Sequence, residues 1–256
     1  NMLKYAKEMG HEAIGIVDFQ NIQAFPEIFN NAKKIGIKPI YGSTFSVISK
    51  EHNLIWNTKK DKEIRKERYV VFDLETTSLN PRTGEIIEFG AIIVENDIAI
   101  KTFQFFVKPS KPISKFTTEL TGISQKMLDE QSKFDNQKDA ILEILRIFDK
   151  STIVAHNALF DIGYIKEKMR QYNLGRLENQ IIDTLNVAKF LLPYSHSYRL
   201  EIVSRKMNIF YDPSVAHRAD YDAKVLQQTW TNMINLLGTK NVKTFNDIEK
   251  IDAKWL

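Results

Sequence analysis

Asp73 and Glu75, two residues apart at the end of an apolar run, have the residue types and the spacing for metal chemistry. They close the segment YVVFDLE, whose near-continuous apolar character is typical of a strand buried on both faces. Because alternate residues of a strand share a face, the two carboxylates point the same way. Two anions on a buried face are costly unless a cation neutralises them, and the hard ions Mg²⁺ and Mn²⁺ prefer carboxylate oxygens. The pair alone is weak support for a metal site, because many such pairs lie in solvent at the rim of a sheet.

Three further residues could join this pair. Asp161 follows the apolar segment STIVAHN and falls in the first turn of a predicted helix, where a lone aspartate usually only favours the helix dipole. Its strand is apolar like that of Asp73, so we expect the end of that strand to bring Asp161 to the same region of the sheet. His217 and Asp222 lie in AHRADYDAKVL, a spacing that fits a histidine on a loop beside an aspartate on the final helix. An imidazole has its pKa near neutral pH, as a general base requires.

These five residues predict a site for two divalent ions about 3.5–4 Å apart. One ion would lower the pKa of an attacking water, both would stabilise charge on a phosphoryl group, and His217 would take the proton of the water. A serine hydrolase or a nucleotide-binding loop is less plausible, because the sequence has neither a GxSxG elbow nor a GxxxxGK[ST] loop. The chain has no cysteine, which excludes thiol nucleophiles, zinc thiolates and disulfides and is compatible with a reducing cytoplasm.

The elements that must position these residues begin at Tyr69. Three strand patterns come first, which predicts an antiparallel meander, and helices and strands then follow. The strands are expected at 69–75, 85–94, 98–108 and 151–157, with a strand or turn at 180–184, and the helices at 115–128, 139–150, 160–172, 186–192, 198–208 and 222–237. The last helix carries an apolar stripe that we assign to the core, formed by Leu226, Trp230, Met233 and Leu237. This order predicts an α/β fold with a mixed sheet flanked by helices.

The first part of the chain has a different organisation. Helices and strands alternate there, at 3–10, 13–19, 24–36 and 38–48. Such a stretch is too short to enclose a good core, so we interpret it as one piece of a larger domain. The charged run NTKKDKEIRKER follows, without apolar periodicity, and predicts a solvated linker with a domain boundary near residue 67.

Composition restricts the partners only loosely. The net charge of +4 and the pI near 9.0 weakly favour a polyanion, yet a lysine-rich proteome would explain them equally well. No apolar stretch approaches the length of a membrane span, and the segment MLKYAKEMGHEA lacks the apolar region of a signal peptide. We therefore expect a cytoplasmic protein with no membrane partner.

The contexts of the five residues carry a family resemblance. VVFDLETTSL, AHNALFDIGYI and HRADYD resemble, in order and spacing, the three exonuclease motifs of the DnaQ-like DEDDh family across residues 68–238. The resemblance implies a ribonuclease-H-like exonuclease fold, with a mixed five-stranded sheet flanked by helices, and Mg²⁺- or Mn²⁺-dependent removal of nucleotides from a 3′ end. By motif position, the direct metal ligands would be Asp73, Glu75 and Asp222. Asp161 would complete the second metal site, and His217 would be the base.

The same resemblance implies contacts to the substrate. Thr76, Asn157 and Phe160 would help to hold the terminal nucleotide. Ser78 departs from the family pattern, which usually has glycine at that position. If the turn needs a positive φ, this serine costs some stability without abolishing metal binding.

The first segment resembles one piece of a PHP domain. A PHP domain interrupted by a DEDDh exonuclease resembles the PolC-type family of bacterial DNA polymerase III alpha subunits. That implies a fragment with a partial PHP domain at 1–56, a charged linker at 57–67, the exonuclease at 68–238, and a tail at 239–256 leading back to the missing PHP part. The PHP metal motif is altered, because Phe19 and Gln20 follow Asp18 and Thr44 stands where the family has glutamate. We infer that this metal centre is dismantled and that the segment has a structural role.

The resemblance favours a proofreading exonuclease that acts on a single-stranded or frayed 3′ end of DNA, in association with the rest of the polymerase chain and the replisome near the nucleoid. The motifs equally fit a freestanding RNA or single-strand exonuclease, although the PHP-like flank argues against it. A non-catalytic interaction module would be expected to lose metal ligands, and all five positions are present. A PHP phosphoesterase is disfavoured by Phe19 and Thr44.

Overall fold

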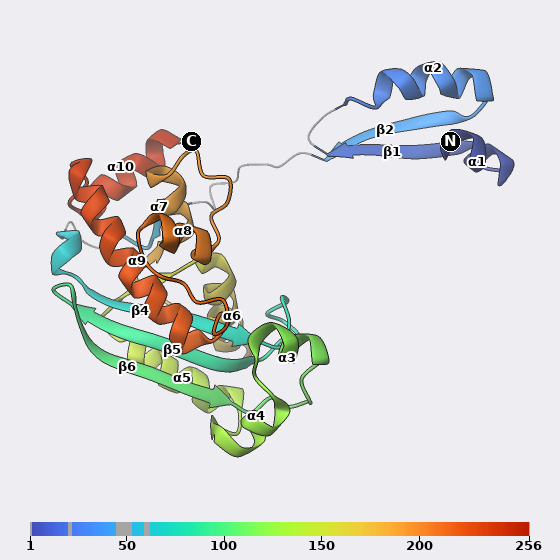
Figure 1. Ribbon diagram of the computed structural model, residues 1–256. Helices are drawn as coiled ribbons and strands as arrows, with labels where there is room; N and C mark the ends of the chain where they lie inside the picture. Colours follow the sequence, from blue (N-terminus) through green and yellow to red (C-terminus); the bar gives the residue numbers. More distant parts are fainter. Residues whose placement is uncertain (1, 20–21, 45–52, 59–61, 256) are drawn as a thin grey trace. The chain divides into compact units, whose positions relative to one another are not determined.

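The computed structural model describes residues 2–19, 22–44, 53–58 and 62–255, which form two compact units (Figure 1). The first unit is Asn1–His52 and the second is Asn53–Leu256. The division precedes the predicted boundary at residue 56, because strand β3 (Ile55–Trp56) pairs with a strand of the second unit. Within the predicted linker, residues 59–61 lie outside the described residues, while Ile64 is buried. The linker prediction is therefore wrong for the segment around Ile64.

The first unit contains the four elements that the sequence predicts. They are α1 (Met2–Glu8), β1 (Ala13–Phe19), α2 (Phe25–Ile35) and β2 (Lys38–Thr44), and the two strands are parallel. Gly36 ends α2 with φ 70°, a conformation that glycine adopts without a steric penalty. A small core forms between the helices and strands and includes Ile16, Ile28 and Ile37. Gln20, part of the altered PHP motif, lies outside the described residues.

The second unit is built on one mixed sheet with the strand order β3-β9-β8-β4-β5-β6-β7. Its longest strands form the predicted meander, β4 (Arg68–Thr76), β5 (Ile86–Glu95) and β6 (Ile98–Val107). Strands β8 (Thr152–Ala155) and β9 (Ile181–Asp183) continue the sheet in parallel with β4. The prediction of five strands is wrong, because β3 and β7 (Ser132–Phe134) add a short strand at each edge. Segments of two and three residues carry too little periodicity to be recognised in a sequence.

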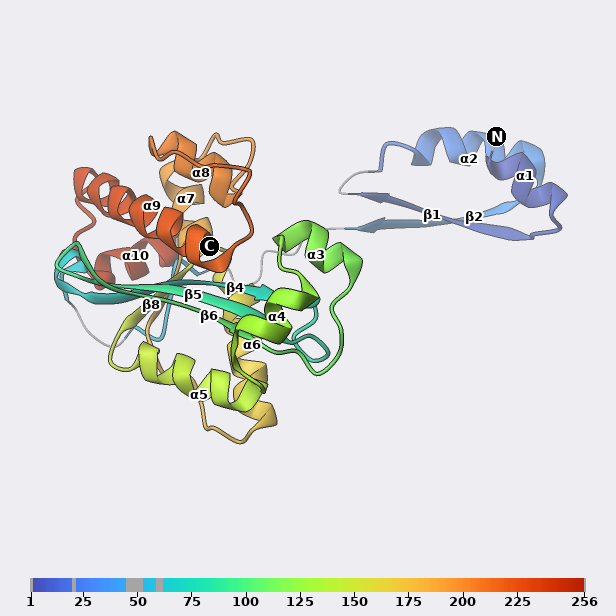
Figure 2. The ribbon, with the colours of Figure 1, turned by 60° about the horizontal axis from the view of Figure 1, so that its bottom comes forward.

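Helices cover both faces of this sheet (Figure 2). One face is covered by α7 (Thr184–Leu191), α8 (Leu200–Lys206), α9 (Ala219–Thr239) and α10 (Phe245–Trp255), and the other by α5 (Gln137–Phe148) and α6 (Ala158–Gln171). Along β4, Val70 and Phe72 belong to the core under α5 and α6, whereas Tyr69 and Val71 belong to the core under α9. This alternation follows from the two-residue period of a strand. The predicted stripe on α9 is buried as expected.

Two regions differ from the predicted elements. The predicted helix at 115–128 is two helices, α3 (Lys115–Thr121) and α4 (Gln125–Gln131), because Gly122 ends the first with φ 69° and Ser124 caps the second. The segment 239–256, predicted as a tail, contains α10, whose Phe245 and Ile248 are buried in the second unit. Through the described part of the chain, every helix is too short or too polar to cross a bilayer.

Candidate active site

Strand β4 delivers the first two carboxylates at its C-terminal end. Asp73 and Glu75 have the same parity as Val71, which packs under α9, so both lie on that face of the sheet. The pairing of β4 with β5 is irregular between Glu75 and Thr76, directly after the second carboxylate. Glu75 is only 8% exposed, although it carries an acidic group. The strand therefore places two carboxylates on one face, with Glu75 buried and Asp73 half-buried.

The other acidic groups come from helix starts. Asp161 lies in the first turn of α6, which follows β8, and is 3% exposed. Asp222 lies in the first turn of α9 and is 6% exposed. Because β8 is parallel to β4, its end and the start of α6 reach the same edge of the sheet as Asp73. These groups line one cavity of about 840 Å³ together with the other predicted site residues, Asp73, Glu75, Thr76, Asn157, Phe160 and His217.

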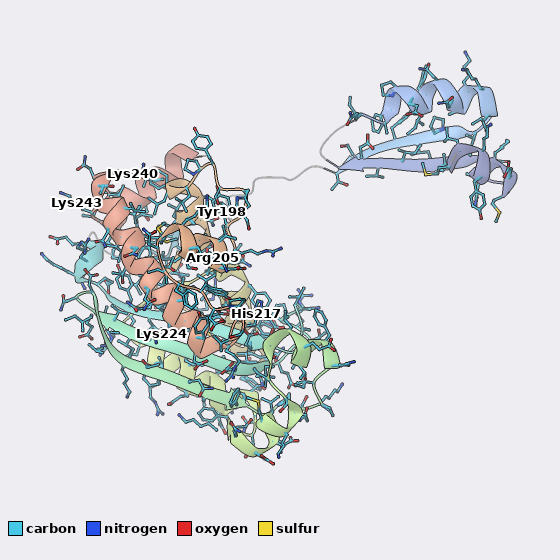
Figure 3. All side chains as sticks on the ribbon, in the orientation of Figure 1. Tyr198, Arg205, His217, Lys224, Lys240 and Lys243 are labelled. Atoms are coloured by element: carbon cyan, nitrogen blue, oxygen red, sulfur yellow. The ribbon has the colours of Figure 1, made fainter. Side chains whose placement is uncertain are left out.

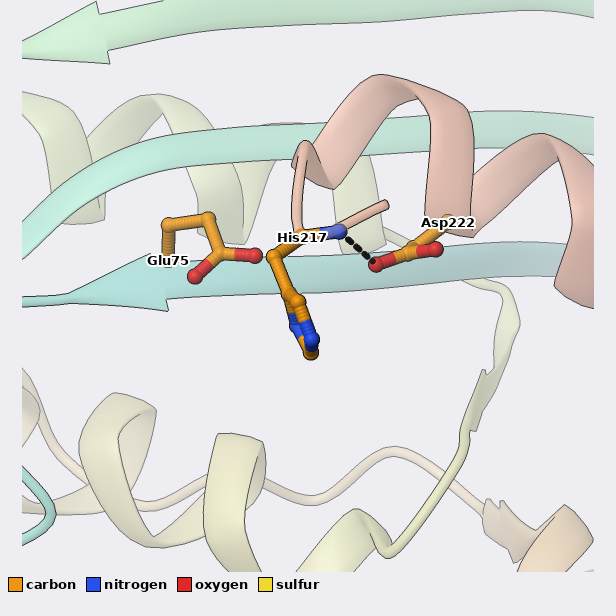
Figure 4. Close-up of side chains that lie close together, drawn as sticks. All are labelled: Glu75, His217 and Asp222. Atoms are coloured by element: carbon orange, nitrogen blue, oxygen red, sulfur yellow. Dashed lines mark hydrogen bonds between the residues drawn. The ribbon is translucent and has the colours of Figure 1, made fainter. Parts of the chain in front are cut away.

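His217 stands on the loop before α9 (Figure 3), where it is exposed and lines this cavity. Its backbone N–H donates to Asp222 Oδ2 at 3.0 Å, which ties the loop to the helix. A ring nitrogen of His217 and one carboxylate oxygen each of Glu75 and Asp222 lie within 4.8 Å of one another (Figure 4). Two strictly different elements, a strand end and a loop–helix junction, thus place three metal-ligating groups together.

The electrostatics of the cavity disfavour charged carboxylates. Burial raises the pKa of Asp73 well above its usual range, and the charges of neighbouring carboxylates add to the effect. Burial is also the main cause that raises the pKa of Glu75 to about 9 and that of Asp161 to about 8. Burial raises the pKa of Asp222 too, against a hydrogen bond from Tyr211 that lowers it. A bound divalent cation would reverse this cost, and the oxygen-rich donor set fits such an ion.

The predicted substrate residues surround the carboxylates. Thr76 Oγ1 donates to the carbonyl of Ser78 at 2.8 Å, and the rings of Phe160 and Tyr164 lie 5.3 Å apart between centroids, tilted by 55°. Asn157 precedes α6 with φ 62° and makes no side-chain cap, which leaves its amide side chain available at the cavity. Ser78 does not share this conformation, since it is absent from the positive-φ residues. Its replacement of glycine therefore carries no backbone penalty.

Sequence reasoning missed three polar residues that hold the site. Asp183 is buried at the end of β9 and accepts the N–H groups of Asn157 and Leu185, and burial raises its pKa to about 6. Tyr211 donates its hydroxyl proton to Asp222 at 3.1 Å. Glu88 is a completely buried carboxylate on β5. Asp183 and Glu88 both interrupt apolar strand patterns, a signal that could have found them, whereas nothing in the sequence around Tyr211 distinguishes it.

The rest of the cavity wall mixes apolar, hydroxyl and charged side chains. Phe116 is 71% exposed on α3, and Leu79 and Leu120 are exposed beside the same cavity. Lys189 and Arg199 also line it. Exposed apolar side chains and the two cations suit a ligand that has flat apolar parts and negative charge.

Comparison with known proteins settles the family. The profile of the RNase T exonuclease family matches residues 70–228, which contain all the predicted site residues. The chain belongs to this exonuclease family. Its fold agrees with solved exonucleases of low sequence identity. The nuclease domain of 3′hExo, a DEDDh family member bound to rAMP, has 18% identity and a TM-score of 0.58, covering 68% of this chain and 94% of that one.

Other relatives extend the comparison. E. coli exonuclease I in complex with a dT13 oligonucleotide has 19% identity and a TM-score of 0.56, over 66% of this chain and 41% of that one. Among curated proteins, the DNA polymerase III PolC-type of Mycoplasmopsis pulmonis is 40% identical over 99% of the chain, and that of Ureaplasma parvum is 38% identical over 96%. The chain spans only 18% and 17% of the length of these two polymerases. The similarity to these polymerases nevertheless extends over the first unit, which the match to the exonuclease family does not cover.

Proposed function

We propose that this chain is the proofreading 3′→5′ exonuclease part of a bacterial replicative DNA polymerase of the PolC type. The observation that carries the proposal is the convergence of four carboxylates, three of them buried, and His217 on one cavity of an exonuclease-family fold. The PolC-type names of relatives that match nearly the whole chain supply the polymerase context. A replicative polymerase works on the chromosome, so we place the protein in the cytoplasm at the nucleoid.

The acidic residues would hold two Mg²⁺ or Mn²⁺ ions. Asp73, Glu75 and Asp222 would be the direct ligands, and Asp161 would complete the second site. Such ions, when bound, lower the pKa of a coordinated water and neutralise charge on the phosphoryl group. Without a cation, burial keeps the pKa of Glu75 near 9, so the carboxylates release protons as the ions bind.

His217 would act as the general base. Its ring lies within 4.8 Å of carboxylate oxygens of Glu75 and Asp222, on the exposed side of the cavity. From there it can accept the proton of the attacking water and release it to solvent. The departing 3′-terminal nucleotide would be held by Thr76, Asn157 and Phe160, which line the same cavity. Exposed Phe116 and Leu79 offer apolar surface on which unstacked bases can stack. The bases of a paired primer end are already stacked in the duplex, so the end must fray before it enters.

The first unit is proposed as a partial PHP domain with a structural role. Asp18 Oδ2 accepts the backbone N–H of Ala24 at 2.9 Å, so this carboxylate is engaged in a hydrogen bond to the backbone of its own unit. The end of the neighbouring strand carries Thr44, a poor metal ligand. An Asp73→Ala chain should therefore show no metal-dependent phosphoesterase activity. Robust activity in that variant would contradict the structural role.

The direct test is digestion of 3′-labelled DNA with paired or mismatched termini, with Mg²⁺ or with EDTA. Faster cleavage of the mismatched end, lost with EDTA, is the expected result. Matched RNA should be the poorer substrate. Cleavage that persists in EDTA or in Asp73→Ala would overturn the metal mechanism, and a preference for RNA would overturn the proofreading assignment.

A further inference from the structure

His217 adopts an unusual backbone conformation for the residue that carries the proposed base. Its φ is 60°, in the left-handed region that non-glycine residues seldom occupy. Such a conformation is retained only where the surroundings over-determine it. On one side, the hydrogen bond to Asp222 fixes the N–H of His217. On the other side, the chain continues directly into Arg218.

Arg218 is held by a carboxylate that is not among the predicted site residues. Glu88 is 0% exposed and lies on β5, where it pairs in register with Glu75. Its oxygens accept Arg218 Nη2 at 3.0 Å and Arg218 Nε at 3.2 Å. They also accept the backbone N–H of Ala219 at 3.1 Å and Gln104 Nε2 at 2.8 Å. Four donors therefore hydrogen-bond to the carboxylate of Glu88, and these bonds satisfy the buried charge without a metal ion.

The backbone at this point has little room to move. A Cβ atom on Gly90 would lie 2.1 Å from the carbonyl carbon of Ala219, so the start of α9 rests directly on β5. The guanidinium of Arg218 also lies over the ring of Phe106, 5.4 Å from its centroid. Two side chains and one strand surface thus fix the residue that follows His217.

We propose that Glu88 and Arg218 are positioning residues that set the placement of His217, an inference that rests on the proposed role of His217 as base. Helix α9 has a large buried face of its own, including Leu226 and Trp230, which docks it without the ion pair. A buried ion pair is in any case weak support for stability, because desolvation offsets its attraction. The two hydrogen bonds from Arg218 to Glu88 instead fix the position of Arg218, the residue next to the base.

The test uses Arg218→Lys in the 256-residue chain, which keeps the charge and removes the two-pronged contact. We expect kcat on single-stranded DNA to fall about 10- to 100-fold with little change in KM, since small misplacements of a catalytic group have effects of that size. Arg146→Ala is the matched control, because Arg146 makes an exposed ion pair with Glu143 on α5. Affinity for Mn²⁺, measured by calorimetry, should be unchanged in both variants. Wild-type kcat in Arg218→Lys would overturn the proposal.

A double-mutant cycle separates positioning from a general structural effect. His217→Ala alone sets the floor of activity, and adding Arg218→Lys should lower it by no more than about 2-fold if the arginine acts through the histidine. Multiplicative losses would overturn the proposal. Should Arg218→Lys fail to fold in a thermal melt, the paired Glu88→Gln and Arg218→Gln variant, which leaves no buried charge, takes its place in the cycle.

A second readout does not depend on exonuclease activity. In histidine-labelled protein, the backbone and ring NMR signals of His217 should shift in Arg218→Lys and stay in place in Arg146→Ala. If the wild-type chain cleaves no DNA, the proposed function fails while this measurement still reports on positioning. Unchanged His217 signals in Arg218→Lys would overturn the positioning role whatever the activity.

Discussion

Two strands of this protein end in the same way and lead to different outcomes. In the first unit, AIGIVDF places Asp18 near the end of β1, and in the second, YVVFDLE places Asp73 near the end of β4. Each strand has a parallel neighbour. Asp18 accepts the N–H of Ala24, whereas desolvation and the charges of neighbouring carboxylates raise the pKa of Asp73.

The difference lies in what other elements bring to the strand end. Asp18 pairs in register with Ser43, and β2 ends at Thr44, so the neighbouring strand adds only hydroxyl groups. At Asp73, α6 adds Asp161 and α9 adds Asp222 from positions far along the chain. A carboxylate at a strand end becomes a candidate metal site only through such convergence. Matched substitutions in the two units can test this comparison.

The largest effect is expected for the two aspartates. Asp73→Ala should lower the exonuclease rate at least about 1,000-fold, since losing a metal-held charge in the transition state costs about 4 kcal/mol. Asp18→Ala should leave the rate unchanged, because its carboxylate accepts the N–H of Ala24 within the first unit and does not line the cavity. Release of nucleotides from 3′-labelled DNA measures both. Equal losses in the two variants would erase the distinction between the strand ends.

The next comparison concerns two strand glycines. Gly90→Ala should reduce the rate about 100-fold and destabilise the second unit by about 1–3 kcal/mol, because the new Cβ collides with Ala219 and displaces the start of α9. Gly15 lies in β1, and a Cβ there meets no atom within 4 Å, so Gly15→Ala should be neutral. Thermal melts and rate measurements on both chains provide the readout. A fully active Gly90→Ala chain would show that α9 need not rest on β5.

A smaller effect is expected for exposed phenylalanines. Phe116 on α3 and Phe29 on α2 are exposed to a similar extent, but only Phe116 lines the cavity. Phe116→Ala should raise KM for single-stranded DNA about 10-fold, the equivalent of one lost base-stacking contact. Phe29→Ala should not change KM. An unchanged KM in Phe116→Ala would show that Phe116 on α3 does not contact the substrate.

The smallest effect is a pH dependence of stability. The raised pKa values of Glu75, about 9, and Asp161, about 8, mean that the folded state binds more protons than the unfolded state above about pH 4. Stability without metal, and with it the Tm, should therefore fall as the pH rises from 5 to 9. Mn²⁺ or Glu75→Gln should flatten that slope. A metal-free Tm that rises over this range would contradict the raised pKa values.

Much of the site could be predicted because it follows from local rules. Strand parity places Asp73 and Glu75 on one face, and helix periodicity separates the loop position of His217 from the helical position of Asp222. The residues that support the site could not be predicted because their contacts join segments far apart in the sequence. Glu88 meets Arg218 across 130 residues of sequence, and only the packed sheet shows that a glycine is required where α9 crosses β5.

The boundaries of the second unit escaped prediction for a related reason. Residues 62–68 read as charged and solvated, yet Ile64 donates its N–H to the carbonyl of Lys243 at 2.9 Å and is buried. The segment acquires its order from a partner at the other end of the unit. Neither residues 62–68 nor the segment around Lys243 has enough apolar periodicity for this pairing to be predicted from its own sequence.

This pairing ties the segment before β4 to the segment after α9. Phe245 N–H donates to the carbonyl of Lys62, and Glu63 and Thr244 form an antiparallel bridge, so these two segments lie side by side. The pairing closes the site-bearing chain between them into one loop, and the entropy cost of closing a loop grows only slowly with its length. Both ends of that loop are therefore held by contacts within the second unit itself.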